Sequence, residues 1–323
     1  MKDVASRAGV ALKTVSRVVN GEPGVTPATA SRVLDAIEDL GFRRNESARL
    51  LRTGRTSALG FIGDDLADSD TAALCRGIED RARDHGMLLF SGSTDCDPDR
   101  ERRLAESLTA RRVDGLIIKP APGDHAYLEA EIEAGTATVF VLRPPTGIAA
   151  DTVLADERGG ARAAVAHLIA RGHRRIGLVR GDLARYRPRQ LLAGYGEAMT
   201  EAGLMVDDAW TALTPERVPA APVTAVFCGG RELTARVLRV LAAAGQSQQT
   251  AVVGFGDFGL ADYVRPGLTV VSYDPAEVGR RAAELLFQRI DGRDDEPQRL
   301  VVPMRLVTRG SGEIAAVRPA TTP

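Results

Sequence analysis

The 323-residue sequence has no long hydrophobic run. No apolar stretch reaches the ~18 residues that a membrane-spanning helix needs, so the sequence predicts no membrane segment. The first ten residues, MKDVASRAGV, contain neither the apolar core nor the cleavage site of a secretory signal. We therefore expect the protein to remain in the cytoplasm.

Cysteine is scarce, with only Cys75, Cys96 and Cys228 in the whole chain. The three lie far apart, are odd in number and follow no metal-ligand spacing. This pattern argues against a disulfide framework and indicates reduced, mostly buried thiols.

The usual enzyme motifs are missing as well. The sequence contains no GxxxxGK[ST] phosphate loop, no GxSxG elbow and no HExxH motif, and its four histidines show no ligand spacing. One GxGxxG match, at residues 254–259, has Asp274 at a dinucleotide-like distance, but Arg265, Pro266 and Gly267 follow too soon for a complete crossover helix. The acidic clusters at 64–70 and 95–99 are typical of exposed loops. We expect no catalysis, no cofactor and no metal.

Net charge is close to zero, at −1, but it is unevenly distributed. Residues 1–55 contain ten Lys/Arg and six Asp/Glu, a net charge of +4, which leaves −5 for the remainder. A basic head on an acidic body fits a head that meets a polyanion, although a solvated helical surface has the same appearance.

The basic head reads as three short helices, at 3–8, at 12–20 and from Pro27 to about residue 40. Gly9 suits the tight turn after the first helix, and Thr26 suits the N-cap of the third. Helical spacing predicts that Val15, Val18 and Val19 of the second helix face inward, as do Ala30, Val33, Leu34, Ile37 and Leu40 of the third. Two helices joined by a tight turn and supported by a third form a helix-turn-helix.

The second of these helices is the candidate recognition helix. With Val15 and Val18 buried, Lys13 and Arg17 remain exposed, and both side chains can bond guanine in the major groove. Thr14 and Ser16 suit phosphate oxygens, which fix position without reading sequence.

From residue 57 onward, short apolar strands alternate with helices. This alternation predicts an α/β body with parallel sheets, and the number of units favours two doubly wound lobes. Strands are expected at 58–62, 87–91, 115–118, 138–142, 176–179, 225–228, 251–254 and 268–271, and helices at 72–85, 97–111, 159–171, 189–202 and 232–244.

Several segments, in order along nearly the whole chain, resemble the lactose-repressor (LacI-type) family of transcriptional regulators. They are KDVA (2–5), AGV (8–10), TVSRVVNG (14–21), Asn45, ARLLRTGRT (48–56), RGIE (76–79), RVDG (112–115), GHRRI (172–176) and VVGF (252–255). The resemblance implies a sequence-specific regulator, most often a repressor, that binds a near-palindromic operator in double-stranded DNA as a homodimer. The C-terminal segment after Gly312 has no leucine heptad, so we expect a dimer and not a tetramer.

The resemblance also implies the domain organisation. It predicts a helix-turn-helix head at 1–44 and a hinge helix and linker at 45–56, followed by a periplasmic-binding-protein-like body. The N-terminal lobe would comprise 57–150 plus about 277–302, the C-terminal lobe 151–276 plus about 303–316, and 317–323 would form a tail.

By position, the resemblance assigns DNA contacts along the head and hinge. Leu12, Lys13 and Arg17 match base-reading positions, and Leu51 matches the hinge leucine that wedges into the minor groove, with Ala48 packed close to it. Ala11 departs from the serine usual after the turn. The further expected DNA-contacting residues are Thr14, Ser16, Asn20, Thr26, Thr29 and Asn45.

A small-molecule effector is expected between the two lobes, and here the chain departs from the family pattern. Asp70 and Thr71 replace an aromatic pair, Leu191 replaces an arginine, Gly230 and Arg231 replace Asn-Asp, and Gly256 replaces an aspartate. Because the lost groups stack on sugar rings and bond hydroxyls, we expect a ligand other than an ordinary sugar. The candidate effector-binding residues are Asp65, Asp70, Thr71, Arg143, Arg189, Leu191, Phe227, Arg231, Gly256, Asp257 and Tyr273.

The chemistry of that effector is open at this point. Arg143, Arg189 and Arg231 suit an anionic ligand, whereas Asp65, Asp68 and Asp70 suit a cationic one. A pocket that binds nothing strongly, and a ligand that acts as corepressor instead of inducer, are the remaining alternatives.

Overall fold

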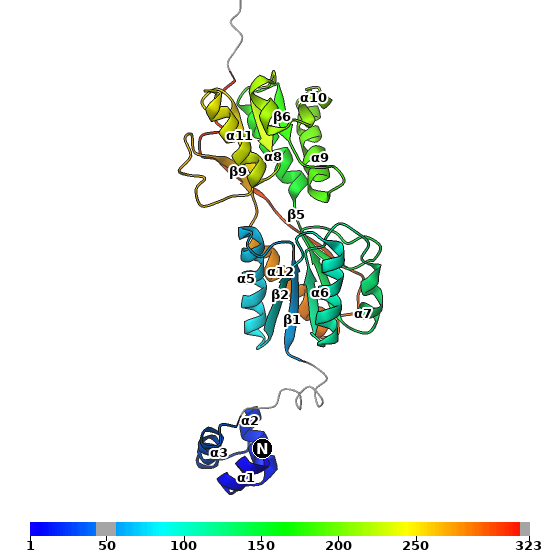
Figure 1. Cartoon of the computed structure of the whole chain (residues 1–323), viewed down its shortest axis with the longest axis vertical. Coiled ribbons are helices and arrows are strands. Elements are labelled where there is room, and N and C mark those ends of the chain that lie inside the picture. The colour runs from blue at the N-terminus through cyan, green and yellow to red at the C-terminus, as the bar shows by residue number, and fades with distance from the viewer. Residues whose placement is uncertain (43–55, 317–323) are drawn as a thin grey trace, which may run out of the picture. The chain divides into compact units, whose positions relative to one another are not determined.

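The computed structural model describes residues 1–42 and 56–316. The chain separates into two compact units, Met1–Thr56 and Ser57–Pro323 (Figure 1). The prediction of a small helical unit preceding a larger α/β unit is confirmed.

The first unit contains the three expected helices: α1 (Lys2–Ala8), α2 (Leu12–Asn20) and α3 (Pro27–Asp39). Gly9 ends α1 with a φ of 66°, a left-handed conformation that lets the chain turn directly into α2. Thr26 caps α3 by accepting the amide of Thr29, and Pro27 occupies the first turn of that helix.

The core of this unit is small. Val4, Ala5, Ala8, Val15, Val33 and Ala36 are buried, and Val18, Val19 and Ile37 pack against them. Leu34 is 56 % exposed and Leu40 is also exposed, so the prediction that both face inward is wrong. So small a core admits only a narrow stripe of α3, and helical spacing alone overestimates the width of that stripe.

The second unit has two lobes, visible in Figure 1 as separate groups of helices and strands. The first lobe contains a six-stranded parallel sheet in the order β10-β5-β4-β3-β1-β2. Its strands are β1 (Ala58–Gly63), β2 (Leu88–Ser93), β3 (Gly115–Ile118), β4 (Ala137–Val141), β5 (Asp151–Ala155) and β10 (Arg299–Val302), and its helices are α5 (Ser69–Asp84), α6 (Pro98–Ala110), η1 (Ala126–Leu128), α7 (Glu129–Glu133) and α12 (Pro275–Ile290).

The second lobe contains a five-stranded sheet in the order β11-β9-β8-β7-β6. All pairings are parallel except that of β11 with β9, an antiparallel edge that the sequence did not predict. Its strands are β6 (Ile176–Val179), β7 (Ala225–Cys228), β8 (Ala251–Phe255), β9 (Thr269–Ser272) and β11 (Arg305–Val307), and its helices are α8 (Glu157–Ala170), α9 (Tyr186–Glu201), α10 (Asp208–Thr211), η2 (Pro215–Ala220) and α11 (Arg231–Ala243).

Helices cover both faces of each sheet, as the doubly wound prediction requires. In the first lobe α5 and α12 pack on one face and α6 on the other, whereas in the second lobe α8 and η2–α11 contact the sheet from separate hydrophobic clusters. Aspartate side chains cap the amino ends of several of these helices, as Asp68 does for α5, Asp156 for α8 and Asp274 for α12.

The chain passes between the lobes at three places in the described part of the second unit: after β5, after β9 and between β10 and β11. The expected lobe boundary after residue 150 therefore needs correction, because β5 pairs with β4 in the first lobe and the chain leaves that lobe only after Ala155. The lobe to which β5 belongs is decided by the strands with which it pairs, and the composition of β5 alone does not reveal that pairing.

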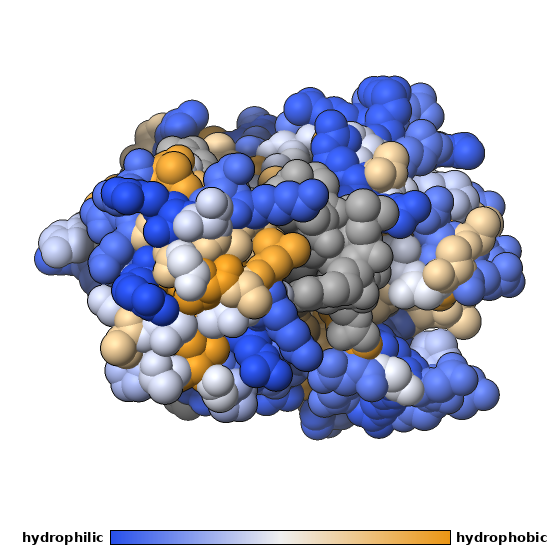
Figure 2. All heavy atoms as spheres, turned by 90° about the horizontal axis from the view of Figure 1, so that it is seen from below, coloured by the Kyte–Doolittle hydropathy of each residue, from blue (hydrophilic) through white to orange (hydrophobic). Residues whose placement is uncertain are grey.

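No helix among the described residues is long and apolar enough to cross a membrane. Figure 2 shows one face of the molecule, on which hydrophilic residues predominate and hydrophobic ones form small separate groups.

Candidate functional site

The first candidate site is the exposed side of α2 in the head. Val15 is fully buried against α1 and α3, and this orientation turns the amino-terminal end of α2 outward. Leu12 is 46 % exposed and Lys13 is exposed, whereas Thr14, Ser16 and Arg17 are half-buried. The first turn of α2 contains no acidic residue. A short helix with an exposed, cationic amino end has the form that enters a major groove.

The flanks of α2 differ in how they are held. Ala11 at its N-cap has no side-chain capping bond, which agrees with the loss of the expected serine. Thr26 and Thr29 lie together at the start of α3, with their hydroxyl oxygens 2.9 Å apart. An ion pair of 2.8 Å between Arg7 and Asp39 joins α1 to the end of α3. Asn45, Ala48 and Leu51, predicted to act in the hinge, lie outside the described residues.

The second candidate site is a cleft of about 620 Å³ in the second unit, bordered by residues from both lobes. This volume is within the usual range for small-molecule sites. Loops that follow β1, β3 and β4 form one wall, and loops that follow β6, β7 and β8 form the other. The cleft thus lies at the carboxyl ends of the parallel strands, where ligands of such sheets gather.

Asp64 is the centre of the charge on the first wall. Its carboxylate accepts from the Lys119 ammonium at 2.6 Å, from Arg143 at 2.9 Å and from the Thr71 hydroxyl at 3.1 Å. Burial favours the neutral carboxyl, but Lys119 and Arg143 outweigh it and hold the pKa of Asp64 below its usual range. Burial also lowers the pKa of Lys119. One carboxylate therefore neutralises only one of two neighbouring cations.

Glu157 and Arg187 form the ion pair of the second wall, with Arg187 Nε donating to Glu157 Oε1 at 2.6 Å. The Arg187 guanidinium also lies over the ring of Phe255, 4.9 Å from its centroid. Glu157 is 2 % exposed, and its Oε2 atom has no hydrogen-bond partner. Burial raises the pKa of Glu157 despite the neighbouring Arg187.

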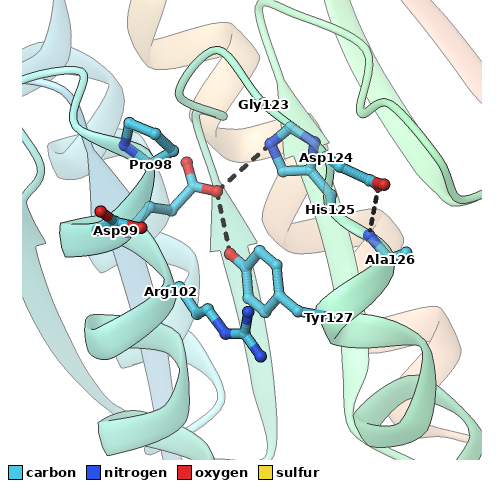
Figure 3. A pocket seen from close by; sticks show the side chains of 9 residues that line it. Pro98, Asp99, Arg102, Gly123, Asp124, His125, Ala126 and Tyr127 are labelled. Atoms are coloured by element: carbon cyan, nitrogen blue, oxygen red, sulfur yellow. Dashed lines mark hydrogen bonds and ion pairs between the residues drawn. The ribbon is translucent and has the colours of Figure 1, made fainter.

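A smaller hollow of about 220 Å³ lies beside the cleft. The side chains around this hollow hold part of the rim of the cleft in place. The buried carboxylate of Glu101 lies between His125, 3.3 Å away, and Tyr127, whose hydroxyl donates to it at 3.0 Å; both rings are labelled in Figure 3. The other oxygen of Glu101 accepts the amide of Ala121 at 2.5 Å, and His125 Nδ1 accepts the amide of Thr146 at 3.1 Å. Burial and Glu101 raise the pKa of Tyr127. These hydrogen bonds hold the loop after β3, at Ala121, and the loop after β4, at Thr146, which both border the cleft.

The structure divides the predicted effector residues into two groups. Asp70, Arg143, Arg189, Arg231 and Gly256 border the cleft.

The other six predicted residues do not border it: Asp65, Thr71, Leu191, Phe227, Asp257 and Tyr273. Leu191 and Phe227 are fully buried in the hydrophobic core, and Thr71 is buried beneath Asp64. Asp257 pairs with Arg309 at 2.7 Å, and Asp65 accepts the amide of Ala67. Burial raises the pKa of Tyr273, whose hydroxyl has no hydrogen-bond partner.

Sequence reasoning missed Asp64, Lys119, Glu157, Arg187 and Phe255 as cleft residues. Asp64 and Lys119 directly follow a strand, and Phe255 ends one. The rule that ligands gather at strand ends could therefore have found these three residues. Glu157 is the first residue of α8 and Arg187 the second of α9, and no local pattern distinguishes them from other first-turn residues.

No group of three or more His, Cys, Asp or Glu side chains that could hold a metal occurs in residues 1–42 and 56–316. The three thiols are free, with Cys228 buried and Cys75 and Cys96 half-buried, so the prediction of mostly buried thiols holds for one of them.

A helix-turn-helix head followed by a two-lobed unit with a polar cleft defines the class of this protein: a DNA-binding transcriptional regulator with an effector-binding domain. Family models agree, because residues 1–45 match the bacterial regulatory proteins of the lacI family and residues 165–312 match the periplasmic binding protein-like domain.

The chain is 33 % identical over 333 residues to the HTH-type transcriptional regulator CelR of Thermobifida fusca, with 96 % of this chain and 97 % of that protein covered. The solved complex of transcriptional regulator CelR with cellobiose is similar at a TM-score of 0.70 and 30 % identity, covering 96 % of this chain and 98 % of that one. The lac repressor dimer bound to operator has the same fold, at a TM-score of 0.82 and 24 % identity, with 96 % and 98 % covered. The chain belongs to the LacI family of transcriptional regulators, a family without enzymatic activity.

Proposed function

We propose that the protein represses transcription as a homodimer on a near-palindromic operator, with the α2 helix of each head in a major groove. The observation on which this proposal depends is the exposed, cationic amino end of α2, held outward by the buried Val15. Two such helices related by a two-fold axis would read half-sites about one helical turn apart. An operator-binding repressor acts where the DNA is, in the cytoplasm.

The proposed contacts follow the position of each residue on the head. Leu12, Lys13 and Arg17 would read bases, and Thr14, Ser16, Asn20, Thr26 and Thr29 would bond the DNA backbone. The shared cap of Thr26 and Thr29 supports a joint phosphate contact at the start of α3. Leu51 would kink the operator from the minor groove, with Asn45 and Ala48 beside it.

A small molecule in the cleft would act as the effector by changing the orientation of the two lobes. Paired charges dominate the cleft, and the ring face of Phe255 is covered by Arg187, which supports a ligand other than an ordinary sugar. Inducer and corepressor logic predict opposite effects of this ligand on operator affinity.

Exposed apolar side chains on the second unit support the homodimer. β2 is an edge strand of its sheet, and it exposes 69 % of Leu88 and 46 % of Phe90. Leu260 and Tyr263 are exposed in the loop after β8. An open strand edge with exposed apolar residues is a surface that proteins normally cover.

Selection of bound sequences from a randomised duplex pool, at physiological salt, tests the proposal. The expected result is an enriched near-palindrome whose affinity falls steeply with added salt. Recovery of no enriched sequence from the purified dimer, with or without an extract of small metabolites as effector source, would contradict it.

A further inference from the structure

An ion pair joins the two lobes at the cleft. Arg231, the first residue of α11 in the second lobe, donates through Nη1 to Asp70 at 2.5 Å and through Nη2 to Asp68. Both carboxylates belong to the start of α5 in the first lobe. All three side chains are among those that border the cleft, and we call this contact the cross-cleft ion pair.

The local structure prepares each partner for this contact. Asp68 caps α5 with its Oδ1 atom, which accepts the amides of Asp70 and Thr71, and this leaves Oδ2 directed to Arg231. Gly256 lies against the stem of Arg231, where an added Cβ would be 3.4 Å from Cγ and where the φ of +84° disfavours other residues. Asp70, Arg231 and Gly256 are all positions at which the sequence departs from its family.

Helix electrostatics make the contact asymmetric. The amino end of a helix favours carboxylates and disfavours cations, so Asp68 and Asp70 suit α5, whereas Arg231 is poorly placed on α11. The carboxylates of the opposite lobe compensate that cost only while the lobes are together. Burial opposes the charged forms of Asp68 and Arg231, yet the Thr71 amide and Arg231 lower the pKa of Asp68, and the two aspartates raise the pKa of Arg231.

We infer that the cross-cleft ion pair closes the two lobes without a ligand and so sets the orientation of the lobes in the free protein. The cross-cleft ion pair borders the effector cleft of the proposed function. The inference rests on that proposed function only where it links the orientation of the lobes to operator affinity. A molecule whose binding moves the two lobes apart must break this contact, and added salt must weaken it. The closed state of the sensor is thus built from the chain's own side chains.

Hydrogen–deuterium exchange of the full-length protein tests the inference through segments that do not touch Arg231. Arg231→Gln should accelerate exchange of the amides of Lys119 and Ala121 in the first lobe and of residues 184–187 and Arg189 in the second, all of which border the cleft, by about threefold to tenfold. Asp70→Asn should do the same from the other lobe, and the double variant should add little to either single change. Thermal unfolding of each variant shows whether the fold is kept.

Arg236→Gln is the matched control, because Arg236 lies on the same helix but pairs with Glu216 within its own lobe. It should leave exchange in both cleft segments unchanged. Unchanged exchange across the cleft in Arg231→Gln and Asp70→Asn, or equal acceleration by Arg236→Gln, would overturn the inference. Because no DNA is present, either result leaves the operator-selection experiment to decide the proposed function separately.

Discussion

Asp64 shows how a single carboxylate organises the first wall of the cleft. It lies directly after β1 and accepts hydrogen bonds from Lys119 and Arg143, which come from the loops after β3 and β4. These loops follow strands that are neighbours in one sheet, so the sheet brings three distant segments to one carboxyl group. Removal of the carboxylate would leave two cations facing each other in a mostly buried place.

Asp64→Asn should therefore destabilise the sensor unit at pH 7 by somewhat less than the about 3–5 kcal/mol typical of breaking a fully buried pair, because the Asp64 side chain is partly exposed. Because the pKa of Asp64 is lowered on folding, its contribution is present above its ordinary value of 3.8 and is lost as pH falls through the lower folded value. The urea-unfolding difference between wild type and Asp64→Asn should thus shrink in strong acid. Glu106→Gln, which breaks an exposed pair with Arg102, should change stability by less than about 0.5 kcal/mol.

Arg17 carries the prediction for DNA reading. Arg17→Ala should weaken binding to the selected operator by about 10- to 100-fold, since a good base contact contributes about 1–3 kcal/mol, and should weaken binding to random duplex much less. Fluorescence anisotropy on both duplexes at one salt concentration measures this. Arg32→Ala, at an exposed position of α3, is the comparison variant. Equal losses of affinity on both duplexes for Arg17→Ala would argue against base reading.

At this scale the sequence identified part of the cleft. Arg231 was found at a position that differs from the family pattern, whereas Leu191 was proposed for the same reason and lies in the core. Position in a pattern does not reveal which side chain turns outward. Glu157 was missed because its burial, and the lack of a hydrogen-bond partner for its Oε2 atom, are visible only in the packed structure.

Among the elements, α5 and α12 make the closest helix contact of the first lobe. A Cβ at Gly77 would lie 2.2 Å from the carbonyl oxygen of Ala276, and a Cβ at Gly279 would lie 2.2 Å from that of Leu74. Each helix therefore uses a glycine to admit the backbone of the other. Neither glycine adopts a special backbone conformation, so their role is to leave space.

Gly77→Ala should destabilise the sensor unit by about 2–3 kcal/mol, because the two helices must separate to admit the methyl group. Gly196 on α9 is the matched control, since nothing lies within 4 Å of an added Cβ there. Gly196→Ala should be neutral or stabilise by up to about 1 kcal/mol. Chemical denaturation of both variants measures the difference, and a neutral Gly77→Ala would show that the contact yields easily.

The sequence predicted eight of the strands to within two residues and missed β5, β10, β11 and helix α12. β10 is an exposed edge strand, and β11 has three residues, so neither has the apolar run of a buried strand. β5 is fully buried, but it begins with Asp151 and Thr152 and has only three apolar residues, and no helix separates it from β4. α12 has clear start signals in Asp274, its N-cap, and Pro275 in its first turn.

At the scale of the whole molecule, the exposed edge of the first lobe makes a prediction about assembly. Phe90→Asp should shift the protein from dimer to monomer, because a buried charge on each copy would oppose association across a two-fold axis. Sedimentation equilibrium at several concentrations measures the shift. Met205→Asp, which changes an exposed apolar residue in the other lobe, should leave the dimer intact, and an unchanged dimer in Phe90→Asp would place the interface elsewhere.

The three passages of the chain between the lobes have a consequence for proteolysis. Each lobe is completed by a segment that arrives after the chain has visited the other, with α12 and β10 returning to the first lobe and β11 to the second. A single cut in any surface loop of the sensor unit therefore divides the sequence but frees neither lobe. The two fragments stay together because segments from both belong to the same folded lobes. A protease would have to cut all three passages before one lobe could leave the other.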